Sequence, residues 1–176
     1  MAESETETEY AAEPIVRMTG ALDPRGGWTA SRCTIAKAID VVGNRSMFLF
    51  LREAFYGTTR FDDFAARVGV TESVAAARLK SLVDEGLLEK RPYREAGERT
   101  RYAYHLTAMG ADFFPVLVAL MQWGERWREP SGVVMRHRDC GAPVHAELRC
   151  AHGHPVTVRE VDLAPKSPAA RVDSED

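Results

Sequence analysis

The chain has 176 residues, of which 45% are hydrophobic, and a formal net charge of −3 at pH 7. This length allows one core with appendages, and the acidic balance excludes a protein that binds polyanions with its whole surface, so nucleic-acid binding requires a local basic patch. No apolar run reaches the roughly 20 residues of a membrane span, and the N-terminus lacks a signal-peptide pattern. Three cysteines without framework spacing are typical of reduced thiols. We expect a cytoplasmic protein without membrane contacts.

The two ends of the chain differ from its middle. Residues 1–31 are rich in Glu, Thr, Ala, Gly and Pro and lack an apolar period, which predicts a disordered arm. Residues 164–176 have the same character and are predicted to form a disordered tail. Between them we expect one domain over residues 32–128 and a small extension over residues 129–163.

Helical spacing of apolar residues predicts three short helices in residues 33–69. In the first, apolar residues from Ile35 to Val42 fall at i, i+3, i+4 and i+7 and therefore line one face. Residues 45–57 and 60–69 have similar spacing, and each stretch ends at a glycine, which commonly terminates a helix.

A fourth helix is predicted after Thr71, which can cap it, with Ala75, Leu79 and Leu82 pointing inward. Its opposite face carries small or basic residues, as a helix needs if its short side chains are to approach base edges in the DNA major groove. An ordinary solvated face is the alternative. The candidate DNA contacts on this helix are Thr71, Ser73, Ala76, Ala77, Arg78 and Lys80.

After Gly86 the apolar period changes from helical to two. Residues 87–94 and 101–107 flank the loop EAGE and predict a β-hairpin, with Leu88, Tyr102, Tyr104 and Leu106 as inward candidates. Short helices followed by a basic hairpin follow the order of a winged helix-turn-helix, in which the guanidiniums of the wing meet DNA phosphates. The candidate phosphate contacts near the tip are Arg91, Arg94, Arg99 and Arg101.

A long helix is predicted to start near Thr107, with a bend at Pro115. Apolar residues surround more than one of its faces, which favours packing against a second copy of the chain together with the first helix. A fully buried core helix is the alternative. The candidate dimer contacts are Ile35, Ile39, Phe113, Leu117, Leu120, Met121 and Trp123.

Several motifs together resemble the HxlR-type winged-helix transcriptional regulators, relatives of the MarR group. They are LREAFYGTTRFDDF, VTESVAAARLKSLVDEGLLEKRPY, RYAYHLTAMG and QWGERW, in an order that covers about residues 33–127. The chain departs from the family pattern at residues 44–47, where NRSM replaces a Gly-Lys-Trp type turn, and at Ala75, where Leu is commoner. The resemblance implies a mainly α fold with a small β-hairpin and a long C-terminal dimerisation helix. It also implies a homodimer that binds a palindromic operator in double-stranded DNA.

The stretch HRDCGAPVHAELRCAHGH forms a small Cys/His-containing tail that we expect to be β-rich. Its HxxC and CxH spacings could supply zinc ligands, and it looks like the Cys/His knuckle appended to some family members, in which a second CxxC is usual. Here that second pair reads CAHG, so a zinc knuckle and a metal-free β-hairpin both remain open. The candidate ligands are His137, Cys140, Cys150, His152 and His154.

Cys33 lies at the predicted start of the first helix, beside Arg32 and one turn before Lys37. The helix end and the two cations favour the thiolate form. Within the family, a Cys at this place resembles the sensing thiol of members that respond to quinones, aldehydes or hypochlorite. A small buried residue in the dimer seam is the alternative.

These features predict a dimeric, sequence-specific DNA-binding regulator, a repressor rather than an activator, with release by a thiol reaction or a small-molecule effector. A winged helix used for protein contacts is the first alternative, although the retained arginines of the wing disfavour it. A metal-dependent enzyme is the second, and it would have to use the tail cluster alone because no other catalytic constellation has recognisable spacing. We therefore expect no enzymatic activity.

Overall fold

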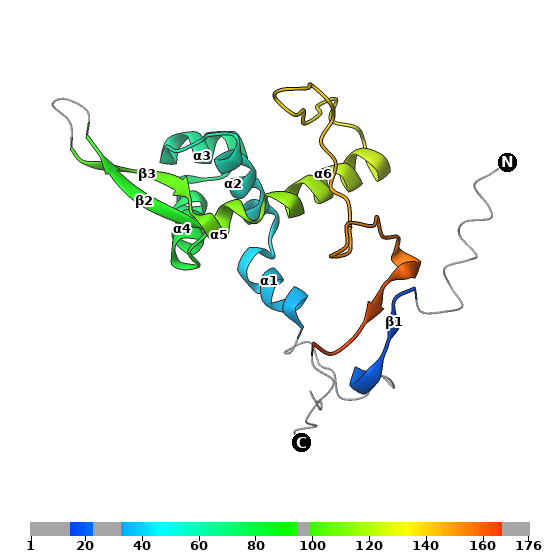
Figure 1. The fold of residues 1–176 in the computed structure, drawn as a ribbon. Helices are drawn as coiled ribbons and strands as arrows, with labels where there is room; N and C mark the ends of the chain where they lie inside the picture. Colours follow the sequence, from blue (N-terminus) through cyan, green and yellow to red (C-terminus); the bar gives the residue numbers. More distant parts are fainter. Residues whose placement is uncertain (1–14, 23–32, 95–98, 167–176) are drawn as a thin grey trace, which may run out of the picture. The chain divides into compact units, whose positions relative to one another are not determined.

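The computed structural model describes residues 15–22, 33–94 and 99–166 (Figure 1). The chain divides into a larger unit, residues 37–146, and a smaller unit made of residues 1–36 and 147–176. Among the described residues, no helix is both long and apolar enough to cross a bilayer.

The predicted series of short helices is confirmed. Asn44 caps the second helix by accepting a hydrogen bond from the backbone N–H of Met47 at 3.0 Å, and Gly69 ends the third with a left-handed φ of 71°. Thr71 caps the fourth by accepting from the backbone N–H of Val74. The helices are α1 (Thr34–Val42), α2 (Arg45–Phe55), α3 (Phe61–Val68) and α4 (Glu72–Asp84).

The core of the larger unit lies where α2, α3 and α4 meet. Phe50 of α2 stacks on Phe64 of α3 with 5.6 Å between ring centroids, and neither ring is exposed to solvent. The predicted inward face of α4, made of Ala75, Leu79 and Leu82, is fully buried against them. Burial of each large side chain contributes about 1.5–3 kcal/mol, so these few residues fix the orientation of α4.

The predicted hairpin is also confirmed, with β2 (Leu88–Tyr93) antiparallel to β3 (Arg101–Leu106). The backbone N–H of Tyr104 donates to the carbonyl of Thr59 at 2.8 Å, which ties the hairpin to the residues before α3. Leu88 and Tyr104 are buried as predicted, but Tyr102 is 53% exposed. Tyr102 shares a face with Tyr104, yet it pairs with Pro92 near the outer end of the hairpin and is not part of the core.

The single long helix predicted after Thr107 is two helices, α5 (Ala108–Ala111) and α6 (Phe114–Trp127). Pro115 does not bend a continuous helix. It lies in the first turn of α6, where the absent N–H has no intrahelical partner to lose.

The motif around Thr107 and Gly110 joins α5 to the end of α4. The Thr107 hydroxyl donates to the carbonyl of Gly86 at 2.6 Å and accepts from the backbone N–H of Gly110 at 3.0 Å. A Cβ on Gly110 would lie 2.1 Å from the carbonyl oxygen of Leu87, so this close approach requires glycine. The start of β2 and the helices that follow the wing are therefore held together.

The extension after α6 consists mainly of turns. In the larger unit, Arg136 and Pro143 form an isolated bridge, and the backbone N–H of Val144 donates to the carbonyl of Met135 at 2.9 Å. In the smaller unit, Arg149 and Pro155 form a second isolated bridge. The expected β-rich character is thus limited, within the described residues, to such bridges and one strand of two residues.

The smaller unit corrects the prediction for the N-terminus. Residues 15–22 are ordered into β1 (Arg17–Met18) and the 3-10 helix η1 (Gly20–Leu22). β1 pairs in parallel with β4 (Asp162–Leu163), which follows the 3-10 helix η3 (Val158–Glu160). Disorder predicted for the rest of residues 1–31 and for residues 167–176 falls outside the described residues.

Candidate nucleic-acid interface

The outward face of α4 presents small side chains to solvent. Ser73, Ala76 and Ala77 are exposed, whereas Leu79 on the opposite side is fully buried. The Ser73 and Thr71 hydroxyls lie 3.0 Å apart at the N-terminus of the helix, where backbone N–H groups favour phosphate. The face can therefore approach a groove closely.

The charged residues of α4 differ from a simple basic face. Lys80 is exposed but forms an i, i+4 ion pair with Asp84, which the sequence prediction did not include. Arg78 is only half-buried, with an enclosed Nε that has no hydrogen-bond partner within the described structure. A pair between exposed side chains contributes only about 0–1 kcal/mol, so a phosphate can displace Asp84 from Lys80.

The wing next to α4 carries further positive charge. Arg94, Arg99 and Arg101 are exposed at or beyond the ends of β2 and β3. Arg91 is also exposed, and it donates from Nε and Nη2 to Glu89 at 2.9 and 2.6 Å. The wing therefore offers exposed positive charge, and α4 offers a face of small side chains.

Arg60 is a residue of this region that the sequence prediction missed, although it begins the RF motif. Its guanidinium lies 3.3 Å from the centroid of the Tyr93 ring, and its backbone bridges Ala103 of β3. A cation over an aromatic ring contributes about 0.5–2 kcal/mol. Arg60 thus ties the start of α3 to the wing, in a hollow of about 350 Å³ whose floor includes Tyr104. Burial raises the pKa of Tyr104, so its phenol stays neutral.

This geometry agrees with the comparisons with known proteins. Residues 41–132 match the family described as HxlR-like helix-turn-helix. The chain belongs to the HxlR family.

Three relatives support the assignment. Rv3095 of Mycobacterium tuberculosis, an uncharacterized HTH-type transcriptional regulator, is 38% identical over 136 residues, which are 75% of this chain and 85% of that protein. PA1607, provisionally classed as a transcription factor, aligns at 34% identity with a TM-score of 0.67 over 76% of this chain and 94% of its own. PA1374 of Pseudomonas aeruginosa aligns at 34% identity with a TM-score of 0.56 over 78% and 94%. The chain is therefore an HTH-type transcriptional regulator and not an enzyme.

The candidate dimer contacts of this HxlR protein fall into two groups. Ile35 and Ile39 on α1 and Leu120 and Trp123 on α6 are exposed. Phe113 and Leu117 instead pack against the core of their own unit, and the Phe113 ring lies 5.6 Å from that of Phe48. Met121 lines a pocket beside α2. Those three predicted contacts face α2 because α6 starts anew after α5 and packs on α2.

The prediction omitted two exposed apolar residues of α6 that share a face with Leu120 and Trp123. Counted from Val116 as position i, Leu120 lies at i+4, Trp123 at i+7 and Trp127 at i+11. That spacing gives one continuous apolar stripe along the helix. The QWGERW motif already contained the signal, since its second tryptophan follows the first by four residues.

The Cys/His residues of the tail lie in two places. The Cys140 thiol is 3.5 Å from Nδ1 of His137 in the larger unit, which fits two of the four ligands of a zinc site. In the smaller unit, Cys150 is exposed and the rings of His152 and His154 are 6.3 Å apart. Within the described part of the chain, no group of three His, Cys, Asp or Glu side chains is arranged to hold a metal. Zinc binding stays a prediction.

Cys33 is a free, half-buried thiol directly before α1. Its predicted neighbour Arg32 lies outside the described residues. The half-buried position leaves a path to solvent that a sensing thiol requires.

Proposed function

We propose that this HxlR regulator acts in the cytoplasm as a homodimeric repressor that binds a palindromic operator. The observation that carries the proposal is the pairing of a fully buried inner face of α4 with an outer face of Ser73, Ala76 and Ala77 beside a basic hairpin. α4 enters the major groove, where its short side chains contact base edges. The wing arginines contact the flanking phosphates, which fix the position of the protein without reading sequence.

The apolar stripe on α6 supports the proposal that a second copy of the chain binds there. Its members are Val116, Leu120, Trp123 and Trp127, and all are about half exposed. An exposed apolar strip of this length marks an interaction surface, and a strip on a helix can meet its own symmetry mate. Ile35 and Ile39, four residues apart on α1, add a second exposed apolar surface. A dimer sets two α4 helices at a fixed separation, which a palindrome matches.

Repression requires only that operator occupancy excludes other proteins from the same DNA. The two surfaces described above, one for DNA and one for a second copy, suffice for such occupancy. An activator would need a further surface for the transcription machinery.

Selection of genomic fragments by the purified protein, followed by sequencing, tests the proposal. We expect enrichment of fragments that share an inverted repeat with half-site centres about one helical turn apart, or a multiple of it. The Ala77→Glu protein is the matched control and should enrich none. Equal recovery of all fragments by both proteins would contradict operator recognition and favour a winged helix used for protein contacts.

Release from DNA through Cys33 is a further part of the proposal. An adduct or disulfide at the start of α1 adds bulk beside Ile35, which belongs to the surface proposed for the second copy. Overpacking of a close seam destabilises it by about 1–3 kcal/mol, enough to shift a dimer population severalfold or more.

A comparison of wild-type and Cys33→Ser protein tests this release. Both retain Cys140 and Cys150, and both are treated with diamide or a quinone before operator binding is measured. Loss of binding in the wild type alone supports the switch. Equal loss in both proteins would assign the effect to the tail cysteines, and no loss in either would leave Cys33 as a packing residue.

A further inference from the structure

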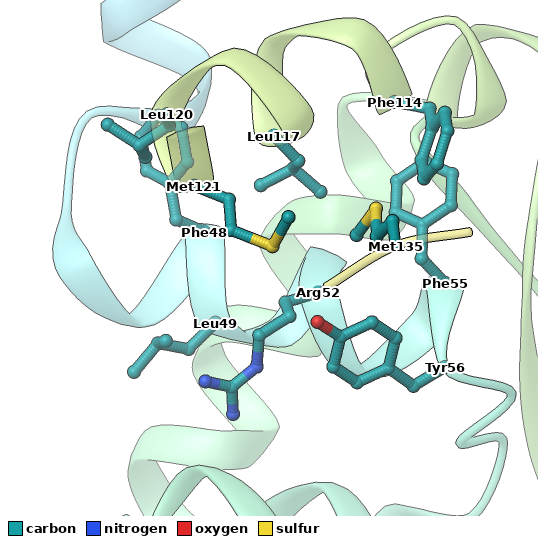
Figure 2. Close-up of a pocket in the computed structure, with 10 residues that line it drawn as sticks. All are labelled: Phe48, Leu49, Arg52, Phe55, Tyr56, Phe114, Leu117, Leu120, Met121 and Met135. Atoms are coloured by element: carbon teal, nitrogen blue, oxygen red, sulfur yellow. The ribbon is translucent and has the colours of Figure 1, made fainter. Parts of the chain in front are cut away.

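A pocket of about 220 Å³ opens between α2 and α6 (Figure 2). α2 contributes the Phe48 and Phe55 rings, and Phe114, Leu117 and Met121 come from α6. Met135, from the segment after α6, forms a further wall. The Phe55 and Phe114 rings are in contact, with centroids 5.2 Å apart, and close one side.

The volume and walls of the pocket define the body of a ligand. An apolar cavity of about 150 Å³ is known to stay dry and to take up benzene, so this larger pocket fits a substituted ring or two fused rings. Aromatic edges and faces favour a flat aromatic body. The thioethers of Met121 and Met135 can adjust to its outline.

The mouth of the pocket is polar on one side. A second, more open hollow shares Tyr56, Phe114 and Met135 with the pocket, so the two adjoin. Its other walls include Arg136, His137, Arg138 and Asp139, a segment with more positive than negative charge. Arg136 is held by a hydrogen bond from Nη1 to the carbonyl of Gly141 at 2.9 Å, and Arg138 is exposed.

Arg52 also lines the pocket, but it is already paired. Its Nε and Nη2 donate to Oε1 of Glu53 at 3.1 and 2.6 Å, and that carboxylate is buried. In Figure 2 the guanidinium points away from the side chains of Leu117 and Met121. The positive charge offered to a ligand therefore comes from the 136–139 segment and not from α2.

The wall that contains Met135 is fastened to α6 by one residue. Oε1 of Gln122 accepts from the backbone N–H of Ala146 at 2.9 Å, and its Nε2 lies 3.0 Å from Nδ1 of His145. The backbone bond from Val144 to Met135 closes the loop at 2.9 Å. Residues 135–146 thus form a loop held against α6, with Met135 facing the pocket and the basic residues at its mouth.

The pocket and the apolar stripe share Leu120 and otherwise occupy different sides of α6. At about 100° per residue, Phe114, Leu117 and Met121 lie about 130° around the helix from Val116, Trp123 and Trp127. A second copy seated on the stripe would therefore meet the pocket at its Leu120 edge and leave the side formed by Phe55 and Phe114 open. The pocket is also flanked by charged side chains, which a partner helix would have to desolvate.

We propose that the pocket binds an aromatic carboxylate of one or two rings, with the ring between α2 and α6 and the carboxylate at Arg138. Such a ligand contacts α2, α6 and the 135–146 loop at once, so it fixes their relative positions. An effect on operator binding rests on the function proposed above, whereas binding in the pocket does not.

Titration calorimetry of the full chain with 2-naphthoate tests the site directly. We expect a Kd below about 1 mM, and a weaker affinity for benzoate because it fills less of the pocket. Arg138→Gln should weaken naphthoate binding about 5- to 10-fold and leave binding of the neutral 2-naphthamide unchanged. Arg67→Gln, which removes an exposed arginine of α3, is the matched control and should change neither.

Variants that fill the pocket distinguish binding in the pocket from binding elsewhere on the protein. Met121→Trp should abolish binding of both compounds, and Met135→Trp, a change in the loop that spares the core, serves if the first variant does not fold. Absence of naphthoate binding to the wild type, or unchanged binding to a folded pocket-filled variant, would overturn the proposal. So would a loss of dimer in both filled variants, which would show that a second copy occupies the pocket. Calorimetry needs no DNA, so a failure of operator binding leaves this result interpretable.

Discussion

Helices α4 and α6 differ in how completely their own unit buries their apolar residues. On α4, Ala75, Leu79 and Leu82 are all fully buried, and the opposite face carries small and polar residues. On α6 only Val118 is buried, while Leu120 and Trp123 remain 49% and 51% exposed. The apolar face of α4 is thus fully covered within one chain, which leaves its opposite face available to another kind of molecule. The apolar stripe of α6 is not covered within one chain, and burial against another apolar surface would stabilise it.

α4 and the wing differ from each other in charge. α4 contributes little net charge because Glu72 and Asp84 offset Arg78 and Lys80. The hairpin bears its arginines on a two-stranded ribbon with little core contact at its outer end. In the proposed complex, attraction to DNA and fit to DNA therefore come from separate elements, so substitutions should change one without the other.

The largest effect is expected from a charge on the stripe of α6. Leu120→Glu should convert the dimer to a monomer and weaken operator binding about 10²- to 10⁴-fold, since two linked half-site contacts become independent. Val133→Glu, which alters an exposed valine outside α6, is the matched control and should stay dimeric. Size-exclusion chromatography with light scattering measures the assembly. A monomeric wild type, or a dimeric Leu120→Glu protein, would contradict the role of the stripe.

A smaller effect is expected from a charge on the outer face of α4. Ala77→Glu places a carboxylate where the helix would meet the groove, and we expect a loss of about 1–3 kcal/mol in operator affinity, which is roughly 5- to 150-fold. The dimer should persist because Ala77 is exposed and distant in sequence from α6. Ala111→Glu on α5 is the control. If a folded Ala77→Glu protein still bound the operator, α4 would not be the helix that enters the major groove.

Substitutions in the wing should change the salt dependence of operator affinity more than the preference for particular DNA sequences. Arg99→Ala should lower the slope of log affinity against log salt by about one, since one phosphate contact releases its counterion. Arg91→Ala should lower it less, because Glu89 already accepts from the Arg91 guanidinium. Affinities measured at several salt concentrations give both slopes. Equal slopes for wild type and Arg99→Ala would place the hairpin tip away from DNA.

The sequence predicted those parts of the fold that depend on local spacing. The helices up to α4, the cap at Thr71 and the hairpin follow from periods and turn residues within short windows, and the structure confirms them. The buried face of α4 could likewise be predicted, because helical spacing places Ala75, Leu79 and Leu82 together. The proposed groove face follows from the same spacing, by elimination of the inward residues.

The differences arose where contacts join distant segments. Phe113 and Leu117, predicted at a dimer seam, pack against the core of their own unit, and the break between α5 and α6 could not be placed from Pro115 alone. The pairing of β1 with β4 joins residues 145 positions apart, and strands of two residues leave no periodic pattern. The pocket likewise needs Met135 to return against α2, which no local signal indicated.

The smallest effect is expected in the smaller unit, where the pairing of β1 with β4 depends on few contacts. Arg17 donates from Nε and Nη2 to both carboxylate oxygens of Asp162, at 2.9 and 2.8 Å. The hydrogen bonds from Arg17 hold the pKa of Asp162 below its ordinary value, and they raise the pKa of Arg17. A folded-state pKa below the unfolded value means that the pair stabilises the strands at neutral pH and loses this contribution as pH falls through the folded pKa.

Amide hydrogen exchange at Thr19, whose backbone N–H donates to the carbonyl of Leu163 at 3.0 Å, reports this pairing directly. Wild-type protein should protect this amide more than Asp162→Asn protein above about pH 5, and the difference should be lost as pH falls through the lowered folded-state pKa of Asp162. Comparison of the two proteins at each pH cancels the intrinsic exchange rate. Because both groups are exposed and screened by solvent, the melting temperature of the larger unit should not change. Equal protection at pH 6 would show that the backbone bonds alone hold the strands, and that the ion pair contributes nothing to them.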